Sequence, residues 1–341
     1  MRCVVVREHG SYEKLLFEER PIPEPGPLEA RIRVKAVGLN HLDTWVRRGV
    51  PGHRFPLPLI PGSDACGVVE ATGPGCRSVR EGDEVVVLPG RSCGACVECQ
   101  SGRDQFCKDY AILGEACDGL SADYAVLPEA NLAPRPRGLS DGEAATICLV
   151  FQTAFQMLVR RAELRAGETV LVHAGLSGVG SAAIQIAQLL GARVLATAGG
   201  KQKCDRVRAL GAEVIDYTAE DFAARVREST GGRGVDVIVD HVGQKTFGPS
   251  LKCLARGGRY VTCGATTGGD ARTPLHLVFF KSLSILGSTM GSKGDLRRIL
   301  ALFEQGRFRP VFDRAFSLTE VAEAHRLLET RQAMGKLALI P

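Results

Sequence analysis

Six apolar, strand-like runs follow one another at short intervals in the second half of the chain, and this ladder limits the fold more than any other feature. They begin near residues 169, 193, 213, 235, 259 and 284. Helical stretches lie between most of them and are clearest at 181–190, 203–210 and 221–228. Strands separated by about 20–26 residues with short loops are typical of βαβ units. The pattern therefore predicts a doubly wound parallel sheet that can hold one dinucleotide.

The first half of the chain has a different pattern, in which short apolar runs are separated by proline and glycine clusters. The runs lie at 31–37, 66–71 and 84–88. Clusters such as 21–27 (PIPEPGP) and 71–75 (ATGPG) are turn-forming. Close-set strands of this kind predict a small, irregular β-barrel.

The length of 341 residues exceeds the usual size of one domain and favours two. After about residue 290 the chain shows two further helices and a strand, at 295–305, 318–330 and 336–340. We expect this tail to rejoin the first domain. The predicted fold is therefore α/β, with residues 1–150 and 291–341 in a barrel domain and residues 151–290 in the doubly wound sheet.

The loop after the first strand of the ladder carries glycines in the order G-x-x-G-x-G. Gly175, Gly178 and Gly180 follow a strand and lead directly into a helix, with Val179 between the last two. Glycine lets the backbone approach a pyrophosphate, and the helix N-terminus supplies unpaired N–H groups and a positive dipole end. The loop is therefore predicted to bind a dinucleotide, the alternative being an ordinary strand–helix turn.

The end of the second strand of the ladder predicts the choice of cofactor. A site for NAD places a carboxylate there, which holds the ribose 2′-hydroxyl. This chain instead has Gly199 followed by Lys201 and Lys203, with no acid before Asp205. Lysines attract a 2′-phosphate, so the sequence favours NADPH over NADH. Lys203 is expected to face the phosphate, whereas Lys201 is equally well explained as a solvated surface charge.

Four of the twelve cysteines lie within fifteen residues, in a lobe at about residues 90–110. Cys93, Cys96, Cys99 and Cys107 have the spacing C-x₂-C-x₂-C-x₇-C. Four thiolates in a short loop can surround one Zn²⁺ tetrahedrally and leave no open position for a substrate. A structural zinc is therefore predicted. Disulfides are disfavoured in a cytosolic chain, and the remaining cysteines are read as small buried hydrophobes.

Charge and hydropathy exclude several classes of partner. The formal charge of +5 combines 43 basic and 38 acidic residues without a basic block, which gives no support for binding nucleic acid. No uninterrupted apolar run approaches the roughly 18 residues of a membrane span. The first residues, MRCVVVREHGSYEK, lack the apolar core of a secretory signal. We therefore expect a cytoplasmic protein without nucleic-acid or membrane partners.

The cysteine lobe and the glycine loop together resemble the medium-chain dehydrogenase/reductase superfamily. Shared segments include GLNHLD at 38–43, GSDACG at 62–67, GDEV at 82–85, DHVG at 240–243 and GK at 335–336. The resemblance covers essentially the whole chain. It implies a GroES-like catalytic domain, a Rossmann domain, an active site in the cleft between them, and a homodimer or homotetramer.

The same resemblance separates two branches by their catalytic metal. Zinc-dependent alcohol dehydrogenases hold a catalytic zinc at three positions that are Asn40, Ser63 and Leu149 in this chain, and Asp64 replaces the usual Glu. Amide, hydroxyl and alkyl groups do not make a zinc site. The catalytic metal is therefore expected to be absent. A displaced site that uses the adjacent His41 and Cys148 is the alternative.

The segment GLNHLD instead resembles the quinone oxidoreductase branch, which lacks catalytic zinc and uses NADPH. This resemblance implies a set of cofactor contacts. Gly199, Lys203 and Tyr217 would contact the 2′-phosphate, and Gly178, Val179 and Gly180 the pyrophosphate. Asn40 would lie near the nicotinamide, and the adenosine and nicotinamide side would be lined by Val242, Gly243 and Gly264. The branch does not usually carry the four-cysteine lobe, so the chain combines features of both.

Without a catalytic metal, the negative charge that develops on the substrate must be stabilised by donors or by conjugation. We therefore expect hydride transfer from NADPH to a small quinone, enone or related activated carbonyl. Asn40 or Ser63 could donate a hydrogen bond and His41 or solvent a proton. Asn40 is as well explained as a turn residue and His41 as a packed histidine. The alternatives are an NAD(P)-dependent alcohol or aldehyde dehydrogenase and a non-catalytic NADPH-binding regulatory protein.

Overall fold

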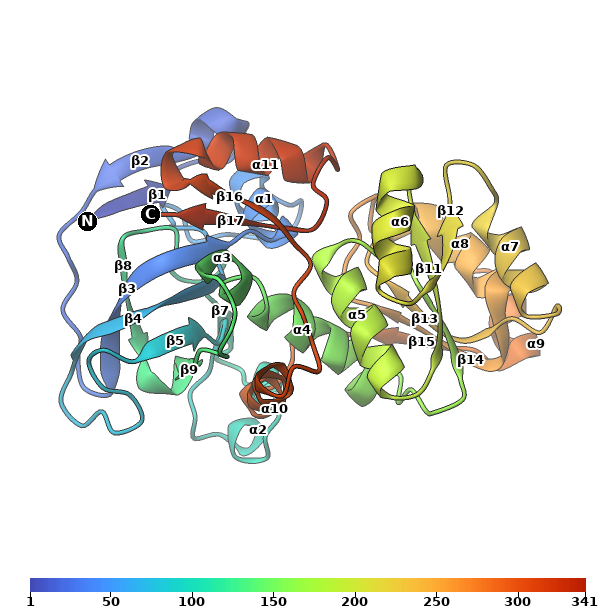
Figure 1. The fold of residues 1–341 in the computed structure, drawn as a ribbon, viewed down its shortest axis with the longest axis horizontal. Coiled ribbons are helices and arrows are strands. Elements are labelled where there is room, and N and C mark those ends of the chain that lie inside the picture. Colours follow the sequence, from blue (N-terminus) through green and yellow to red (C-terminus); the bar gives the residue numbers. More distant parts are fainter. The chain divides into compact units, whose positions relative to one another are not determined.

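The computed structural model describes all residues, 1–341, and the chain divides into two compact units (Figure 1). One unit combines Met1–Leu149 with Ser292–Pro341, and the other is the continuous segment Val150–Gly291. The C-terminal residues thus share a unit with the N-terminal half of the chain, as the blue and red ribbons of Figure 1 show.

The unit Val150–Gly291 is built on a six-stranded sheet in the order β12-β11-β10-β13-β14-β15. Every neighbouring pair is parallel. The strands are β10 (Thr169–Val172), β11 (Arg193–Ala198), β12 (Glu213–Asp216), β13 (Val235–Asp240), β14 (Leu254–Thr262) and β15 (Ser284–Gly287). The strand order reverses between β10 and β13, the point at which open parallel sheets bind ligands beyond the carboxyl ends of their strands. The predicted doubly wound sheet is confirmed.

Five helices cover this sheet, because each parallel connection must cross back over one of its faces. They are α5 (Gly178–Leu189), α6 (Lys201–Ala209), α7 (Phe222–Ser229), α8 (Gln244–Cys253) and α9 (Leu275–Lys281). Figure 1 shows α5 and α6 in front of the sheet. A continuous core of buried strand and helix residues includes Leu171, Ile238 and Tyr260 from the strands with Val226 and Leu251 from α7 and α8.

The other unit is organised around the long strand β3 (Glu29–Gly38). Its sheet has the order β16-β17-β3-β4-β5-β9, and β8 also pairs with β3. Apart from the parallel β16–β17 pair, the strands are antiparallel. The strands are β4 (Asp64–Thr72), β5 (Glu84–Val87), β8 (Tyr124–Pro128), β9 (Leu132–Pro134), β16 (Phe312–Ser317) and β17 (Lys336–Ile340). The expected α/β class, with one mainly antiparallel unit and one Rossmann-like unit, is confirmed.

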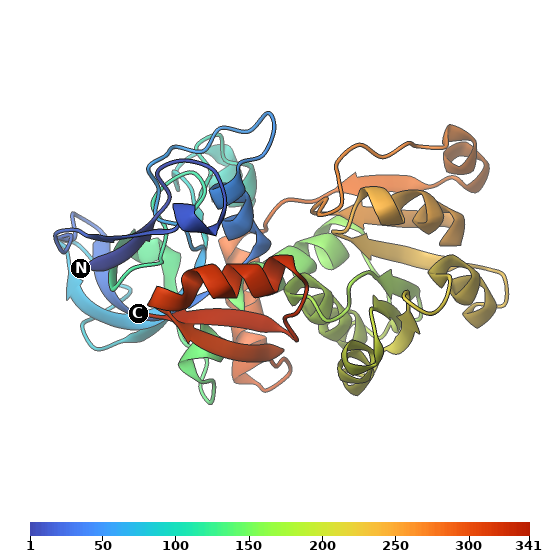
Figure 2. The ribbon, with the colours of Figure 1, turned by 90° about the horizontal axis from the view of Figure 1, so that it is seen from above.

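Two small two-stranded sheets and several short helices complete this unit (Figure 2). The sheets pair β1 (Arg2–Val5) with β2 (Leu16–Glu19) and β6 (Gly90–Arg91) with β7 (Ala111–Ile112). The α-helices are α1 (His41–Arg48), α2 (Val97–Gln100), α3 (Asp141–Ala144), α10 (Lys293–Glu304) and α11 (Val321–Glu329). Single turns of 3₁₀-helix lie at Tyr12–Lys14, Asp104–Phe106, Glu129–Asn131 and Leu318–Glu320.

The register of three strands brings distant residues together at one end of this sheet. Gly38, the last residue of β3, lies opposite Asp64 of β4 and opposite Ala338 of β17. A Cβ at Gly38 would lie 2.1 Å from the carbonyl oxygen of Ala145, so only glycine fits there. The segments that start just after β3, at β4 and at β17 therefore converge on a single polar cluster.

Helix α4 (Cys148–Phe155) continues into a π-helix at Gln156–Arg161. The helical stretch Asp141–Arg161 is long and apolar enough to cross a membrane by length and composition, although no such span was expected from the sequence. Its apolar window is 78% buried inside the protein. Core helices pass the same test, and this burial is the environment of a core helix.

Candidate functional site

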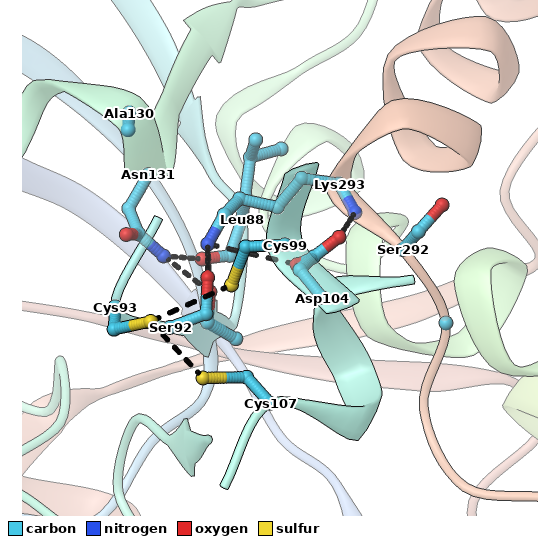
Figure 3. A network of polar contacts seen from close by, with 12 residues as sticks. Leu88, Ser92, Cys93, Cys99, Asp104, Cys107, Ala130, Asn131, Ser292 and Lys293 are labelled. Carbon is cyan, nitrogen blue, oxygen red and sulfur yellow. Dashed lines mark hydrogen bonds and ion pairs between the residues drawn. The ribbon is translucent and has the colours of Figure 1, made fainter. Parts of the chain in front are cut away.

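The four clustered cysteines bring their sulfur atoms together although their positions span fifteen residues. Figure 3 shows three of them, Cys93, Cys99 and Cys107. The Sγ atom of Cys93 lies 3.9 Å from that of Cys99 and 3.6 Å from that of Cys107. Cys96 Sγ lies 3.6 Å from Cys99 Sγ. All four ligand atoms lie within 4.8 Å of one another, and none is in a disulfide.

These separations fit a tetrahedral tetrathiolate zinc. A Zn–S bond of about 2.3 Å gives a tetrahedron with sulfur–sulfur edges of about 3.8 Å. The observed sulfur separations lie close to that edge, and the donor set consists of the thiolates that zinc prefers. Cys93, Cys96, Cys99 and Cys107 would hold the ion and would supply all four ligands, so the site is of the structural kind.

A lysine from the C-terminal segment binds the same lobe. The Lys293 ammonium donates to the Gly90 carbonyl at 3.0 Å and to the Ser92 hydroxyl at 2.9 Å, and lies 3.6 Å from the buried carboxylate of Asp104 (Figure 3). The Lys293 backbone N–H donates to Asp104 at 3.0 Å. Residues next to or between the zinc-ligating cysteines are thus tied to the start of α10.

The glycine loop after β10 has little room for side chains. A Cβ at Gly180 would lie 2.2 Å from the carbonyl oxygen of Ala174, whose own φ is +48°. A Cβ at Gly175 would meet the side chains of Ala196 and Val207 at 3.0 and 3.1 Å. The glycines therefore allow α5 to begin directly against the loop, the arrangement that a pyrophosphate requires.

The N-terminus of α5 has backbone N–H groups that could bind an anion. Ser177 caps the helix, since its hydroxyl accepts the N–H of Gly180 at 3.0 Å. No protein acceptor pairs with the N–H groups of Gly178 and Val179 in the first turn. The Ser177 hydroxyl also lies 2.9 Å from Nε2 of His241, and burial lowers the pKa of that histidine to about 4. A neutral imidazole thus supports the loop without adding a charge.

The loop after β13 is shaped by the buried carboxylate of Asp240. It accepts the N–H groups of Val242 at 2.6 Å and Gly243 at 3.1 Å, and the hydroxyl of Thr246 at 2.5 Å. Gly243 has φ +90°, a conformation that favours glycine, and a Cβ there would lie 2.8 Å from Ala265. The predicted residues Val242, Gly243 and Gly264 therefore follow β13 and β14 at the carboxyl edge of the sheet, as the glycine loop follows β10.

The turn after β11 contains the residues expected to select the cofactor. The Tyr217 hydroxyl would lie 2.6 Å from a Cβ at Gly199, so the ring lies against the turn. Lys203 is half-buried on α6, whereas Lys201 is exposed. Asp216 at the end of β12 also lies at this turn, and its carboxylate accepts the N–H of Gly200 at 3.0 Å and the hydroxyl of Thr218 at 2.6 Å.

In the other unit, Asn40 belongs to a buried polar cluster. Its Nδ2 donates to the Asp64 carboxylate at 3.0 Å and to the Gly38 carbonyl at 3.3 Å. Its Oδ1 accepts the Lys336 ammonium at 2.6 Å, and that ammonium also donates to the Leu39 carbonyl at 2.5 Å. Both polar atoms of the Asn40 amide are thus hydrogen-bonded within the protein.

Burial changes the charge balance of this cluster. It lowers the pKa of Lys336 and raises that of Asp64, and the two groups lie 3.9 Å apart. Burial also raises the pKa of Asp43 to about 6, although that carboxylate accepts the N–H groups of Asn40 at 2.7 Å and Gly62 at 3.0 Å. One buried ammonium therefore faces two buried carboxyl groups.

The other predicted catalytic residues lie close to this cluster in the chain. Ser63 is fully buried, and its hydroxyl has no hydrogen-bond partner. His41 is half-buried at the start of α1. Ser63 therefore provides a polar atom that the fold itself does not use.

The three positions that the family resemblance assigns to a catalytic zinc do not fit that ion. Asn40 offers an amide that is already bonded to Lys336 and Asp64, Ser63 a hydroxyl and Leu149 an alkyl side chain. Among the His, Cys, Asp and Glu side chains, those of the four-cysteine lobe lie close enough together to hold a metal ion. His41 and Cys148 are not gathered with a third such ligand.

Two residues of these sites were missed from the sequence. Lys336 was noted only as part of a family segment, because nothing local shows that β17 pairs with β3. Asp216 was overlooked because it lies thirteen residues beyond Lys203, and only the pairing of Ala198 with Asp216 brings it to the turn. A strand ending in a charged residue beside the second strand of the ladder is the signal that could have found it.

Comparisons with known proteins agree with this geometry. Residues 26–137 match the alcohol dehydrogenase GroES-like domain, and residues 178–305 match the zinc-binding dehydrogenase family. A quinone oxidoreductase of Pseudomonas aeruginosa is 33% identical, with 98% of this chain and 97% of the relative covered. A crotonyl-CoA reductase of Streptomyces avermitilis is 31% identical over 98% of this chain and 84% of the relative. A solved structure of an NAD-dependent alcohol dehydrogenase is 50% identical over both full lengths, with a TM-score of 0.96.

The fold, the glycine loop and these similarities define an NAD(P)-dependent oxidoreductase that acts on small molecules. The chain belongs to the medium-chain dehydrogenase/reductase superfamily. Its relatives include quinone oxidoreductases, alcohol dehydrogenases and enoyl-CoA reductases, so membership alone leaves the substrate open.

Proposed function

We propose that this enzyme transfers hydride from NADPH to an electron-poor carbon–carbon double bond or a quinone, without a catalytic metal ion. The observation that carries the proposal is the cluster of Asn40, Asp64 and Lys336. It places a buried ammonium against the amide that stands at a metal-ligand position in zinc-dependent relatives. The Lys336 ammonium opposes metal binding at this position, because it repels a metal ion and already occupies Oδ1 of Asn40.

The proposed substrate class follows from hydride transfer without a catalytic metal ion. NADPH supplies the hydride when bound. A simple ketone would then need a Lewis acid or strong donors to stabilise an alkoxide, whereas an enone, a thioester-conjugated alkene or a quinone spreads the developing charge through its own conjugation. The similarity to a quinone oxidoreductase and to a crotonyl-CoA reductase supports this class.

Each residue near the cluster then has a proposed role. Asn40 positions the segment between β3 and α1, since both ends of its amide are bonded within the protein. Ser63 carries the hydroxyl that is left to donate a hydrogen bond to a substrate oxygen. His41 or solvent supplies the proton that completes the reduction.

NADPH is proposed over NADH because the end of β11 carries no acid. The turn at Gly199 and Gly200 leads into α6, whose first residues include Lys201 and Lys203. The carboxylate of Asp216 lies at this turn, but its Oδ1 already accepts the N–H of Gly200 and the N–H and hydroxyl of Thr218. We propose that Gly199, Lys203 and Tyr217 receive the 2′-phosphate.

The association of chains is a further part of the proposal. Helix α9 exposes Leu275, Phe279 and Phe280, and β15, the last strand of its sheet, exposes Ile285. An edge strand flanked by exposed apolar side chains favours association. It supports the homodimer or homotetramer expected from the family resemblance. The cytoplasmic location stays a prediction.

The test of the function is a survey of substrates with stereospecifically deuterated NADPH. Enones and enoyl-CoA thioesters should take up deuterium at the β-carbon, and quinones should oxidise NADPH. Turnover should survive prolonged treatment with a strong chelator that leaves the protein folded. Transfer to simple ketones alone, or activity that a chelator abolishes and zinc restores, would reject the proposal.

Cofactor choice is tested separately by the affinities for NADPH and NADH. We expect the wild type to prefer NADPH and Lys203→Ala to lose most of that preference, while Arg208→Ala, on the same helix but paired with Asp205, keeps it. A wild type that binds NADH at least as tightly as NADPH would remove this part of the proposal.

One observation favours a second candidate, an NAD-dependent alcohol dehydrogenase. The 50% identity to a structure described as such an enzyme exceeds that to the quinone oxidoreductase. This candidate predicts oxidation of alcohols with NAD⁺ and loss of that activity under chelation. The substrate survey above separates the two.

A further inference from the structure

A cavity of about 220 Å³ lies in the unit Val150–Gly291, and none of the residues proposed to bind the dinucleotide lines it. Gly234 and Leu254, which line it, stand at the starts of β13 and β14. The dinucleotide loops follow the ends of the strands. Because all six strands are parallel, the cavity and the dinucleotide site lie at opposite edges of the same sheet.

The wall of this cavity is strongly basic. Five of its eight lining residues are cationic, and none is acidic. They come from α7, the loop before β13, α8, β14 and α9, and they are Arg227, Arg233, Lys252, Arg256 and Lys281. This concentration contrasts with the chain as a whole, in which 43 basic and 38 acidic residues nearly balance.

Three of the five cations have evident structural partners. Arg233 pairs with Asp236 at 2.5 Å. The Arg256 guanidinium donates to the Phe280 carbonyl at 2.9 Å, and the Lys281 ammonium donates to two carbonyls, at 2.8 and 2.9 Å. The last two cations thus satisfy carbonyl groups at or near helix ends, a common role for basic side chains.

Arg227 and Lys252 have no such partner. Their side chains are exposed and make no hydrogen bond or ion pair within the protein, yet both line the cavity. Burial lowers the pKa of Lys281, and the nearby charges of Arg227 and Arg256 act in the same direction. Both charges are therefore available to an anion that enters the cavity.

We propose that this cavity binds a small anion that carries phosphoryl groups, such as a diphosphate. Its volume lies below the about 300–1,000 Å³ typical of sites for drug-sized ligands, so only a compact group fits. Arginine forks bind phosphate oxygens in pairs, and lysine adds a point charge. Gly232 and Gly234 leave part of the wall without side chains, where an anion can approach the backbone.

The site is tested by calorimetric titration of inorganic pyrophosphate into the full-length, zinc-loaded protein, with the dinucleotide site saturated by NADPH. The test variant is Arg227→Gln/Lys252→Gln. The control is Arg208→Gln/Arg225→Gln, which removes the same charge from exposed positions of the same unit. A second arm replaces pyrophosphate with ATP to learn whether the diphosphate is free or part of a nucleotide.

Saturable binding is expected, with affinity about tenfold weaker in the test variant and changed by less than about twofold in the control. Equal affinity for pyrophosphate and ATP would assign the free anion, and tighter binding of ATP would assign a nucleotide. The proposal is overturned if pyrophosphate does not bind saturably to the folded wild type, or if both variants lose affinity equally. Because no turnover is measured, this outcome is independent of the proposed reaction.

Discussion

Lys336 is expected to be among the most sensitive single residues of the chain. Its ammonium contacts Leu39 and Asn40 and faces the buried Asp64. Lys336→Met would leave two carboxyl groups, those of Asp43 and Asp64, buried without a cation. Removing one partner of a buried pair costs about 3–5 kcal/mol, so urea unfolding should show a loss of free energy of unfolding in this range.

A double variant isolates the electrostatic part of that loss. Lys336→Met/Asp64→Asn removes both charges and should recover a large part of the stability lost by Lys336→Met alone. Equal instability of the single and double variants would show that packing, and not the buried charge, makes Lys336 important.

His325 gives the fold a specific sensitivity to acid. It is fully buried, neither ring nitrogen has a hydrogen-bond partner, and burial together with nearby Arg47 lowers its pKa to about 3. The unfolded chain binds this proton below about pH 6.5, whereas the folded chain does so only near pH 3. Stability contributed by the neutral ring is therefore complete above pH 6.5 and is lost progressively as the pH falls towards 3.

The comparison of wild type with His325→Leu tests this linkage. Below about pH 6 the wild type should lose about 1.4 kcal/mol more per pH unit than the variant. Free energies of unfolding measured between pH 7 and 5 provide the two slopes. Parallel curves would mean that the His325 ring titrates in the folded protein as it does in the unfolded chain.

Single functional residues could be predicted from the sequence where they depend on neighbours in the chain. They could not be predicted where they depend on residues that are distant in sequence. The four cysteines predict a zinc site, because their short spacing is enough to bring the thiolates together. The sequence marks Asn40 as a departure from a metal ligand, but its bonds to Asp64 and Lys336 cross 24 and 296 positions of sequence. No local pattern encodes such pairings, since they depend on which strands become neighbours.

Among the elements, the turn from β10 into α5 should tolerate the least change. In Gly180→Ala the new Cβ would lie 2.2 Å from the Ala174 carbonyl, so the loop must move. Affinity for NADPH, measured by fluorescence titration, should fall at least about tenfold, because the displaced N–H groups no longer meet the pyrophosphate together.

The matched control is Gly294→Ala in the first turn of α10. The nearest atom to its Cβ would be Ser292 Oγ at 3.8 Å, an ordinary contact. This variant should bind NADPH as the wild type does and should be no less stable. If Gly180→Ala behaved in the same way, the close approach of loop and helix would not be needed for binding.

The start of α10 should stabilise the zinc lobe. A tetrathiolate zinc carries a net negative charge, and Lys293 is the cation bonded to Gly90, Ser92 and Asp104 around it. Partners beyond the ligands typically change metal affinity about 10–100-fold. We expect Lys293→Met to release zinc to a colorimetric chelator at least about tenfold faster than the wild type.

Arg298→Met serves as the comparison for this element, because Arg298 lies on the same helix, is largely exposed and pairs with Asp295. Its zinc release should match that of the wild type. Release that is equally fast in both variants would trace the effect to general loosening of α10 and not to Lys293.

Helix limits show why the elements could be predicted only in outline. The apolar pattern predicts a helix over 181–190, whereas α5 begins at Gly178, because two glycines of low helix propensity conceal its first turn. Helix α4 and its π-helical continuation were missed, since an almost uniformly apolar stretch has no periodicity to read. The six parallel strands were found because each contains a short apolar run, although β14 begins at Leu254, five residues before the run expected near 259.

For the whole molecule, the parallel sheet and the two-part organisation could be inferred from the chain, while the details of the first unit could not. Strand β3 pairs with β4, β8 and β17, which come from both ends of the sequence. Such long-range antiparallel pairing leaves no periodic trace. The substrate was equally beyond reach, because quinone, alcohol and enoyl-CoA enzymes share this fold.

In the proposed enzyme a single zinc serves structure and none serves catalysis. The most direct measurement is the zinc content of the purified enzyme per chain, by plasma mass spectrometry, on a preparation with full reductase activity. We predict one zinc per chain, lost on replacement of Cys96 and Cys99 by serine. Two zinc ions per chain, with activity proportional to the second, would contradict the claim.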